Sequence, residues 1–341
     1  MSAAQKNVLV TGASGFIGSH CVIQLLQKGY HVRGAIRVLE RAPSIKSVVG
    51  SLADTSQLTF VECDLMSDQG WDAAMADIDF VLHIASPIPR TTPKNEDDLI
   101  IPAKEGVLRA LQAAKKAGVA RFVMTASTAC IGYGQGQVDK QFDENDWTDP
   151  DHEDNSAYTR SKTIAEKAAR AFIANNPSKM QFCTINPGAV LGPVLESDYG
   201  TSPEIVLKLL KGDFPGIPRL GFPLVDVRDV ADLHIRAMES HDVHMDRFIA
   251  ANEFMWVEEI AEILKHSHPQ YIKKLPKIRL ANILVKIASL MDPVTRSVVF
   301  ELGIKREFKS ELAKQKLGWQ PRSNKEAIIA TANTLIALGL V

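Results

Sequence analysis

Short apolar runs alternate with longer amphipathic stretches through the first half of the chain. The apolar runs are continuous, which is typical of strands with both faces buried, and the longer stretches have apolar residues at helical spacing. Strand and helix in alternation predict an α/β fold with a doubly wound parallel sheet. The pattern predicts strands at Val8–Thr11, His31–Ile36, Leu58–Val61, Phe80–Ile84, Arg121–Thr125 and Met180–Ile185, and helices at Ile17–Lys28, from Trp71, at Leu99–Ala117 and at Tyr158–Ala174.

The alternation loosens after about Pro187, where proline and glycine become frequent. Helical patterns return near Val230–Glu239 and Val257–Lys265, and Glu311–Leu340 has the pattern of a surface helix pair. We therefore expect a Rossmann-type domain and a smaller C-terminal lobe that binds substrate. The expected dinucleotide-binding domain is 1–187 with 225–250, and the expected lobe is 188–224 with 251–341.

Composition narrows the range of partners. The 341 residues have a net charge of −1, with lysine and arginine spread along the chain, so we expect no nucleic-acid or membrane partner. We find no signal-peptide pattern and no apolar run of membrane-spanning length. The four cysteines are far apart in sequence, which indicates buried reduced thiols, a cytoplasmic location and no metal site.

Three glycines follow the first predicted strand in "NVLVTGASGFIGSH". Gly12, Gly15 and Gly18 form G-x-x-G-x-x-G at a strand-to-helix turn, the context in which such a triad is informative. Gly12 allows a sharp turn, Gly15 lets a backbone approach a diphosphate, and Gly18 allows close packing of helix on strand. The helix N-terminus then offers free N–H groups to the phosphates. A glycine-rich turn that binds nothing is the alternative.

Arg37 ends the second predicted strand, where an acidic residue would favour a free ribose 2′-hydroxyl. An arginine there can fork onto a 2′-phosphate, which favours NADPH over NADH, and Arg33 and Arg41 could share the role. Asp64 and Leu65 follow the third strand, where they could hold the adenine ring. The Asp64 side chain could equally cap the next turn.

Catalytic chemistry is indicated by "NSAYTRSKTIAEK". Tyr158 and Lys162 are four residues apart on a predicted helix and so share a face. A nearby ammonium lowers the pKa of a tyrosine, which is otherwise near 10 and too high for acid–base work at neutral pH. Ser127 follows the fifth strand, where its hydroxyl could donate to a substrate carbonyl, with Thr128 as a rival. An ordinary surface pair and a loop-capping serine are the alternatives.

These residues together resemble the extended short-chain dehydrogenases/reductases, and within them the dihydroflavonol 4-reductase-like branch that includes microbial aldehyde and ketone reductases. The resemblance rests on "VTGASGFIGSH", "VLHIASP", "TAST", "YTRSK", "INPGAVLGP", "VDVRDVADLH" and "LGWQPRS", which span most of the chain. It implies a Rossmann-type fold, NADPH and a Ser127–Tyr158–Lys162 catalytic set. "TAST" departs from the Thr-Ser-Ser form of the plant enzymes, which makes a plant-like substrate doubtful.

The resemblance also implies coenzyme contacts at Ala85, Ser86 and Pro87 and at Pro187 and Gly188. The full set of expected coenzyme-binding residues is Gly12, Ser14, Gly15, Phe16, Ile17, Gly18, Arg37, Asp64, Leu65, Ala85, Ser86, Pro87, Thr125, Tyr158, Lys162, Pro187, Gly188 and Val190. Position and apolar character suggest substrate contacts at Ile88, Pro89, Ile131, Tyr133, Leu191, Tyr199 and Phe222.

The expected function is NADPH-dependent reduction of a hydrophobic or aromatic aldehyde or ketone to an alcohol, with Tyr158 as the proton donor. One alternative is a sugar-nucleotide epimerase or dehydratase of the same fold that retains NAD, which Arg37 disfavours. Another is a dinucleotide-binding module without activity, although such modules tend to lose the Tyr or the Lys. Leu99–Ala117 and Tyr158–Ala174 could pair across a two-fold axis, so either a monomer or a homodimer is expected.

Overall fold

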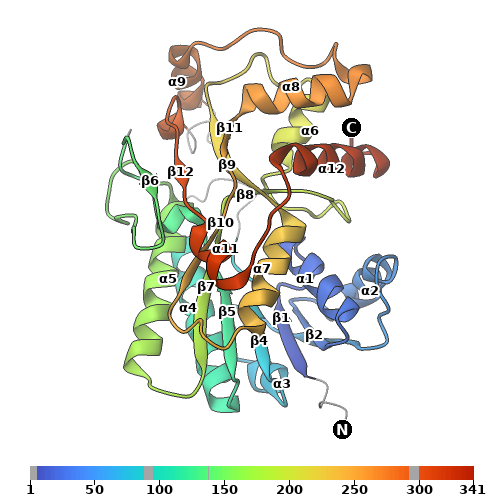
Figure 1. Cartoon of the computed structure of the whole chain (residues 1–341), viewed down its shortest axis with the longest axis vertical. Helices are drawn as coiled ribbons and strands as arrows, with labels where there is room; N and C mark the ends of the chain where they lie inside the picture. The colour runs from blue at the N-terminus through green and yellow to red at the C-terminus, as the bar shows by residue number, and fades with distance from the viewer. Residues whose placement is uncertain (1–5, 88–94, 137, 292–298) are drawn as a thin grey trace.

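A seven-stranded parallel sheet forms the centre of the molecule (Figure 1). The computed structural model describes residues 6–87, 95–136, 138–291 and 299–341. The strand order is β10-β7-β5-β4-β1-β2-β3, so the chain reverses direction across the sheet between β1 and β4. The strands are β1 (Asn7–Thr11), β2 (His31–Ile36), β3 (Leu58–Glu62), β4 (Phe80–His83), β5 (Arg121–Thr125), β7 (Gln181–Pro187) and β10 (Arg247–Ala250).

Helices cover both faces of this sheet, which confirms the predicted Rossmann-type α/β fold. Buried residues of α1 (Phe16–Gln27), α2 (Ala42–Gly50), α7 (Val227–Glu239) and α11 (Glu311–Leu317) form one apolar layer against the strands. The other layer holds residues of α3 (Trp71–Met75), α4 (Asp97–Ala117) and α5 (Ala157–Asn175). Burial of both strand faces explains why the strands are continuously apolar in sequence.

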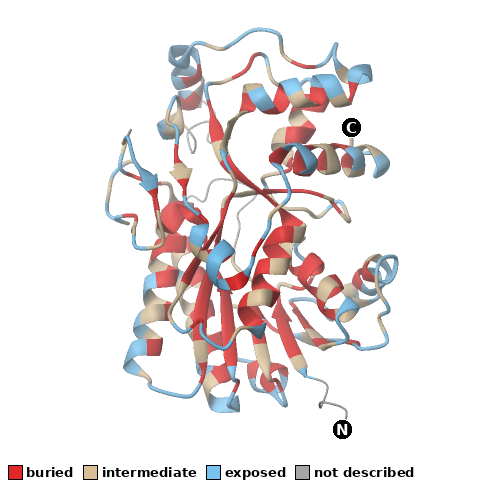
Figure 2. Ribbon diagram, viewed as in Figure 1, coloured by how far each residue is buried: buried red, intermediate tan, exposed pale blue. Residues whose placement is uncertain are grey.

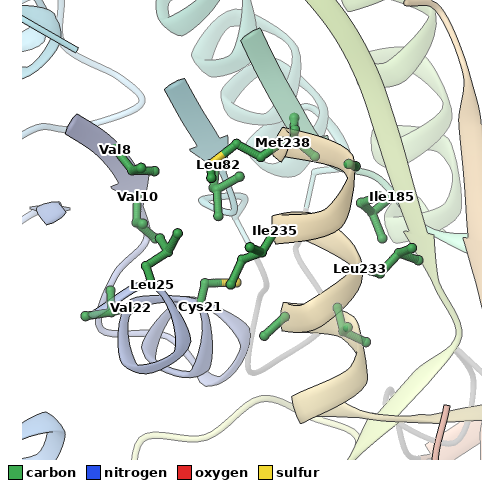
Figure 3. Packing of buried hydrophobic residues seen from close by; sticks show 14 of the residues in the cluster. Val8, Val10, Cys21, Val22, Leu25, Leu82, Ile185, Leu233, Ile235 and Met238 are labelled. Carbon is green, nitrogen blue, oxygen red and sulfur yellow. The ribbon is translucent and has the colours of Figure 1, made fainter. Parts of the chain in front are cut away.

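The first apolar layer shows why the sheet needs distant parts of the chain (Figure 3). Val10 of β1 and Leu82 of β4 are fully buried beneath α1 and α7. Cys21 and Leu25 of α1 face Ile235 of α7, although more than 200 residues separate them. Residues from both ends of the chain therefore share one core, and Figure 2 shows burial continuing along the central strands.

A smaller lobe lies beyond the carboxyl edge of the sheet (Figure 1). Its three-stranded sheet has the order β11-β9-β8, and a two-stranded sheet pairs β12 with β6. The strands are β8 (Ala189–Leu191), β9 (Gly221–Asp226), β11 (Phe254–Trp256), β6 (Gln141–Phe142) and β12 (Glu307–Phe308). The helices are α6 (Glu204–Lys211), α8 (Val257–Ser267), α9 (Asn282–Met291) and α12 (Asn324–Ala337), and short 3-10 turns cover Leu39–Arg41, Thr128–Cys130, Pro269–Tyr271 and Val299–Glu301.

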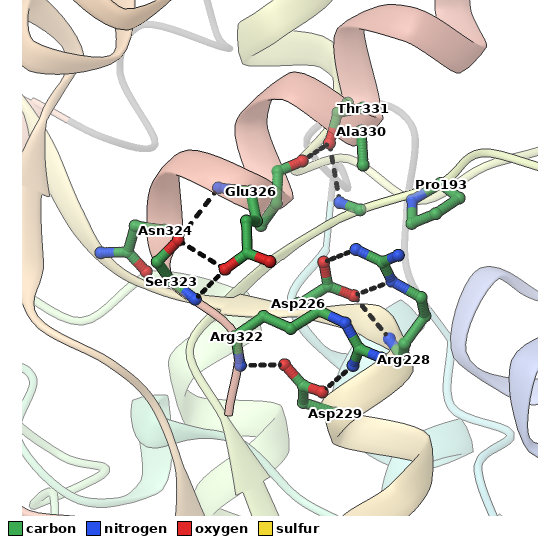
Figure 4. Close-up of polar contacts among 12 residues, drawn as sticks. Pro193, Asp226, Arg228, Asp229, Arg322, Ser323, Asn324, Glu326, Ala330 and Thr331 are labelled. Carbon is green, nitrogen blue, oxygen red and sulfur yellow. Dashed lines mark hydrogen bonds and ion pairs between the residues drawn. The ribbon is translucent and has the colours of Figure 1, made fainter. Parts of the chain in front are cut away.

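Polar contacts fasten the lobe to the larger domain (Figure 4). Asp226 caps the N-terminus of α7 and forms an ion pair with Arg228. Asp229 in the same helix accepts the backbone N–H of Arg322, in the segment that leads into α12. Thr331 of α12 accepts the N–H of Gly192 at 2.7 Å. The Asp229–Arg322 contact therefore holds the lobe against the edge where parallel sheets bind ligands, and the Thr331–Gly192 contact joins α12 to the segment after β8 within the lobe.

The predicted elements occur close to their predicted bounds, but several elements were not predicted from the pattern. These include β10, α2 and the strands of the lobe. Such strands are only two to six residues long, and proline and glycine interrupt their surroundings, so their period is weak. The domain boundaries proposed from the sequence stay a prediction. Within the described ranges, no helix has the length and apolar character needed to cross a bilayer.

Candidate active site

The turn between β1 and α1 leaves no room for a side chain at Gly12 or Gly18. A Cβ on Gly18 would lie 2.0 Å from the Gly12 carbonyl oxygen, and one on Gly12 would lie 3.0 Å from the Ala85 backbone. Gly12 also has a φ of +66°, which favours glycine. The N-terminus of α1 has no capping side-chain bond and no acidic residue in its first turn. Its N–H groups can therefore bind an anion, and the bare glycine backbone fits a diphosphate.

A buried contact holds the segment after β4 against this turn. The Ala85 N–H donates to Thr11 Oγ1 at 3.1 Å, and the same hydroxyl lies 3.1 Å from His83 Nδ1. Burial, with a smaller contribution from the Lys162 charge, lowers the pKa of His83 to about 3, so the ring is neutral at physiological pH. Ala85, Ser86 and Pro87 follow as a half-buried segment beside Gly12.

Arg37 is the arginine of this region that can bind an incoming phosphate. Its side chain is exposed directly after β2 and has no hydrogen bond or ion pair within the described ranges. Arg33 instead donates to the Ala73, Ala74 and Ala76 carbonyls at the end of α3. Arg41 pairs with Glu196 and Asp198. The suggestion that Arg33 and Arg41 share the role of Arg37 is therefore not supported.

Asp64 shapes the turn after β3. Its Oδ1 accepts the Met66 N–H at 2.8 Å, and its backbone carbonyl accepts the Trp71 indole N–H. The Leu65 carbonyl accepts a bond from Arg109 at 3.0 Å. The Asp64 carboxylate is exposed and caps the turn, which is the alternative to an adenine contact. Adenine contacts at Asp64 and Leu65 stay a prediction.

Ser127 and Tyr158 meet above the end of β5. Ser127 is buried, and its Oγ accepts the Ala129 N–H at 3.1 Å. Tyr158 lies in the first turn of α5, a helix capped by the Ser156 hydroxyl. Burial raises the pKa of Tyr158, and a hydrogen bond from Ser127 opposes this increase. Both hydroxyls are hydrogen-bond donors of the kind that can bind a carbonyl oxygen.

Lys162 lies one turn further along α5 and is buried. Its Nζ donates to the Thr125 carbonyl at 3.5 Å. Burial lowers the pKa of Lys162 to about 8, although the charges of Cys130 and Glu166 oppose this. The Thr125 hydroxyl lies 2.7 Å from His234 Nε2 in α7, which further fixes the end of β5. Lys162 therefore loses its charge within reach of physiological pH.

Glu166 is a functional candidate that sequence reasoning missed. It is fully buried one turn after Lys162 and accepts bonds from Arg170, Arg247 and Asn186. Asn186 also donates to the Ser127 carbonyl at 3.1 Å. The Glu166 carboxylate is therefore connected to Ser127 through Asn186, and it lies one helical turn from Lys162. The four-residue spacing of Lys162 and Glu166 indicates that they share a face of the helix. The sequence does not indicate the pairing with Arg247, which is 81 residues from Glu166.

The other predicted contacts are spread over the edge of the sheet. Pro187 is buried at the end of β7, Gly188 packs against the Pro223 carbonyl, and Val190 lies in β8. Ser14, Phe16 and Tyr199 line one small pocket at the N-terminus of α1, and Ile17 is partly buried within that helix. Coenzyme contacts at these positions stay predictions.

The proposed substrate-contacting residues have different environments. Tyr133 is partly buried, burial raises its pKa, and its ring stacks on Phe308 with the ring centres 6.5 Å apart. Phe222 is half-buried in β9. Ile131 and Leu191 are enclosed in apolar clusters and have almost no exposed surface. Ile88 and Pro89 lie outside the described residues.

Comparison with known proteins places this arrangement in a family. Residues 8–249 match the NAD dependent epimerase/dehydratase family. A cinnamoyl-CoA reductase of Medicago truncatula is 33% identical, over 77% of this chain and 81% of its own. The dihydroflavonol 4-reductase of Zea mays is 31% identical, over 79% and 76%. Yeast methylglyoxal/isovaleraldehyde reductase complexed with NADPH superposes with a TM-score of 0.82 at 27% identity, covering 98% and 100%. The chain belongs to the NAD dependent epimerase/dehydratase family, within the extended short-chain dehydrogenases/reductases.

Proposed function

We propose that this protein is an NADPH-dependent reductase that converts a hydrophobic aldehyde or ketone to an alcohol. The observation that carries the proposal is the grouping of Ser127, just after β5, with Tyr158 and buried Lys162 on one face of α5, where the Ser127 hydroxyl acts to lower the pKa of Tyr158. Two hydroxyl donors beside a lysine that is mostly charged at neutral pH suit a carbonyl oxygen that gains negative charge. The relatives named above, which are reductases of carbonyl compounds, support this reaction class.

The residues around β1 fit the coenzyme. The N–H groups at the start of α1 and the bare backbone at Gly15 would hold the diphosphate. Arg37 would bind the 2′-phosphate, because it has no competing partner in the described ranges and its guanidinium can donate two parallel bonds. Ala85, Ser86, Pro87 and Gly188 would line the path toward the carboxyl edge of β5. Bound NADPH supplies the hydride that reduces the substrate carbon.

The protein residues handle the oxygen atom of the substrate. Ser127 and Tyr158 donate hydrogen bonds to the carbonyl oxygen and polarise it. As negative charge develops there, Tyr158 transfers its phenolic proton to the oxygen, which yields the alcohol. Charged Lys162 makes Tyr158 a stronger acid, since an ammonium group favours the phenolate that remains. Tyr158 recovers its proton from solvent afterwards, and its raised pKa means that it stays protonated between turnovers.

An apolar substrate is favoured by what surrounds Tyr158. Tyr133 is partly exposed and presents an aromatic ring, which packs on a buried apolar cluster of Ile131, Phe142 and Phe308. Arg306 stacks over the Tyr133 ring but is paired with Glu301, so its charge is matched. The surroundings of Tyr133 in the described residues therefore suit aryl or alkyl carbonyl compounds better than a charged sugar nucleotide.

The decisive experiment measures loss of absorbance at 340 nm with NADPH and a panel of aliphatic, aryl and flavonoid carbonyl compounds. We expect Tyr158→Phe to lower kcat by about 10²- to 10⁴-fold, the usual contribution of general acid catalysis. Tyr30→Phe is the matched control, because it removes a hydroxyl that donates to Glu239 and leaves the ring in place. No turnover of any carbonyl compound, together with NAD retained through purification, would favour an epimerase instead.

Coenzyme preference has a separate test. Arg37→Ser should raise KM for NADPH by about 10- to 100-fold, since a charge-assisted contact with phosphate contributes roughly 1.5–3 kcal/mol. KM for NADH should change little. Arg33→Gln is the comparison variant, because Arg33 already binds backbone carbonyls. Equal effects on both coenzymes would refute the assignment of Arg37 to the 2′-phosphate.

A further inference from the structure

The outer end of the lobe carries apolar side chains that face away from the protein. We call residues 272–287, from the loop after α8 into α9, the outer rim; it lies at the end of the molecule farthest from the N-terminus (Figure 1). Ile278 is 63% exposed, Ile283 62%, and Leu284 and Ile287 54% each. Figure 2 shows most of α9 as exposed. A cluster of large aliphatic side chains on a surface marks an interaction site.

The exposed side chains of α9 form one stripe. Ile283, Leu284 and Ile287 are spaced by three and four residues, so they lie on the same face of the helix. Val285 points the other way and is buried against the lobe. The helix is therefore apolar on both faces, whereas a surface helix normally has a polar outer face. Its outer face is suited to an apolar environment outside the chain.

The outer rim is also strongly basic. It contains Lys273, Lys274, Lys277, Arg279 and Lys286 and no acidic residue, within a chain whose net charge is −1. Arg279 is paired with Glu258 at 2.7 Å. The four lysines are exposed and have no carboxylate partner in the described ranges. The charge of this surface is thus both local and uncompensated, a feature that the net charge of the chain conceals.

We propose that the outer rim docks onto an anionic lipid surface, with the α9 stripe in the headgroup–acyl boundary and the lysines against lipid phosphates. Long lysine side chains can lie along apolar surface while their ammonium groups reach the headgroups. An exposed aliphatic stripe beside basic residues is the pattern of helices that lie in a membrane interface. An acidic protein would satisfy the lysines, but it would need a complementary apolar groove for the stripe. The net charge of the chain indicates no membrane partner, and the proposal rests instead on the local charge of the outer rim.

The test is co-sedimentation of the full chain with lipid vesicles, without substrate, so that its result is independent of turnover. We expect binding to vesicles of phosphatidylcholine with one-third phosphatidylserine, and little to phosphatidylcholine alone. Replacing Lys273, Lys274 and Lys277 with Gln should weaken binding roughly 100-fold, given about fivefold for each basic residue near an anionic surface. Ile283→Glu with Ile287→Glu should weaken it by at least about tenfold.

Matched controls keep the proposal falsifiable. Lys309, Lys314 and Lys325 changed together to Gln remove the same formal charge elsewhere and should leave binding intact. Leu52→Glu does the same for an exposed leucine at the end of α2, 50% exposed. Equal loss in either control, or equal binding to neutral vesicles, would overturn the proposal. A dimer that Ile287→Glu dissociates, in a chain that does not bind vesicles, would identify a second copy as the occupant instead.

Discussion

Two buried carboxylates in this protein are held by arginines, yet their pKa values move in opposite directions. Burial acts to raise the pKa of Glu166, but Arg247 and Arg170 outweigh it and hold that pKa below its usual range. Burial raises the pKa of Asp229, and Arg322 does not offset it. The arginine side chains explain the contrast: Arg247 is 5% exposed and Arg170 13%, whereas Arg322 is 41% exposed. A partner screened by water cannot compensate a buried acid.

The two clusters also differ in what they contact. Glu166 reaches Ser127 through Asn186 and lies one turn from Lys162, so its charge acts on the candidate catalytic residues. Asp229 accepts the Arg322 backbone N–H (Figure 4). The Trp319 indole N–H donates to the Asp229 carbonyl. The Glu166 cluster therefore affects both the stability of the protein and the candidate catalytic residues, whereas the Asp229 cluster holds the lobe in place.

The largest expected effect is the loss of the Glu166 charge. Glu166→Gln leaves Arg170 and Arg247 buried without a counter-charge and should lower the free energy of unfolding by about 3–5 kcal/mol. Urea denaturation followed by circular dichroism measures this. Glu239→Gln, which breaks an exposed pair with Lys28, is the control and should change stability by about 1 kcal/mol or less. A similar small change in Glu166→Gln would mean that the arginines reach water.

Asp229→Asn should have a smaller effect, about 1 kcal/mol at neutral pH. The amide oxygen can still accept the Arg322 N–H, and the lost ion pair is partly screened by solvent. The same denaturation experiment measures it. Asp232→Asn on the same helix, which breaks a more exposed pair with Arg236, is the comparison variant. A loss as large as that of Glu166→Gln would remove the contrast between the clusters.

The pH dependence of these two effects should have opposite signs. Glu166 has a lowered folded pKa, so its stabilisation is present above the ordinary value near 4.3 and is lost as pH falls through the folded pKa. Asp229 has a raised folded pKa, so its contribution is greatest below about 3.9 and declines as pH rises through the folded pKa. Acidification should therefore shrink the effect of Glu166→Gln and enlarge that of Asp229→Asn. Denaturation across pH 3–7 would show parallel trends if this reasoning fails.

The smallest expected effect is on the alkaline limb of the pH–rate profile. Lys162, with a pKa of about 8, is charged below that pH, so kcat/KM for reduction should decline as pH rises through about 8. Glu166 favours the charged form, so Glu166→Gln should move the limb to lower pH, while Asp229→Asn leaves it in place. If the alkaline limb does not move in Glu166→Gln, the Glu166 carboxylate does not influence the Lys162 pKa during the reaction.

The sequence predicted the parts of this molecule whose information is local. The six predicted strands and the glycine turn have strong short-range patterns, and the structure has them close to the predicted bounds. Tyr158 and Lys162 share a helical face, and Ser127 lies at the expected strand end. What these residues do stays a proposal, since their roles follow from chemistry and resemblance.

Other features depend on contacts that no local pattern contains. Glu166 is charged in the sequence like any surface glutamate, and only the fold brings Arg247 to it from β10. Ile131 and Leu191 have the apolar character of a substrate wall, but the fold encloses them in the core. The lysines of the outer rim are visible in the sequence, whereas the exposure of the α9 stripe is not.

The place of β10 has a consequence for biosynthesis. This strand covers the edge of β7, and α7, just before it in the chain, covers Val10, Leu82 and Ile185. A nascent chain that ends after Pro187 would therefore present an unpaired strand edge and an uncovered apolar face until the ribosome has added some sixty further residues. During that interval the growing chain is a natural client for chaperones, and truncation there should yield aggregates instead of an independent nucleotide-binding domain.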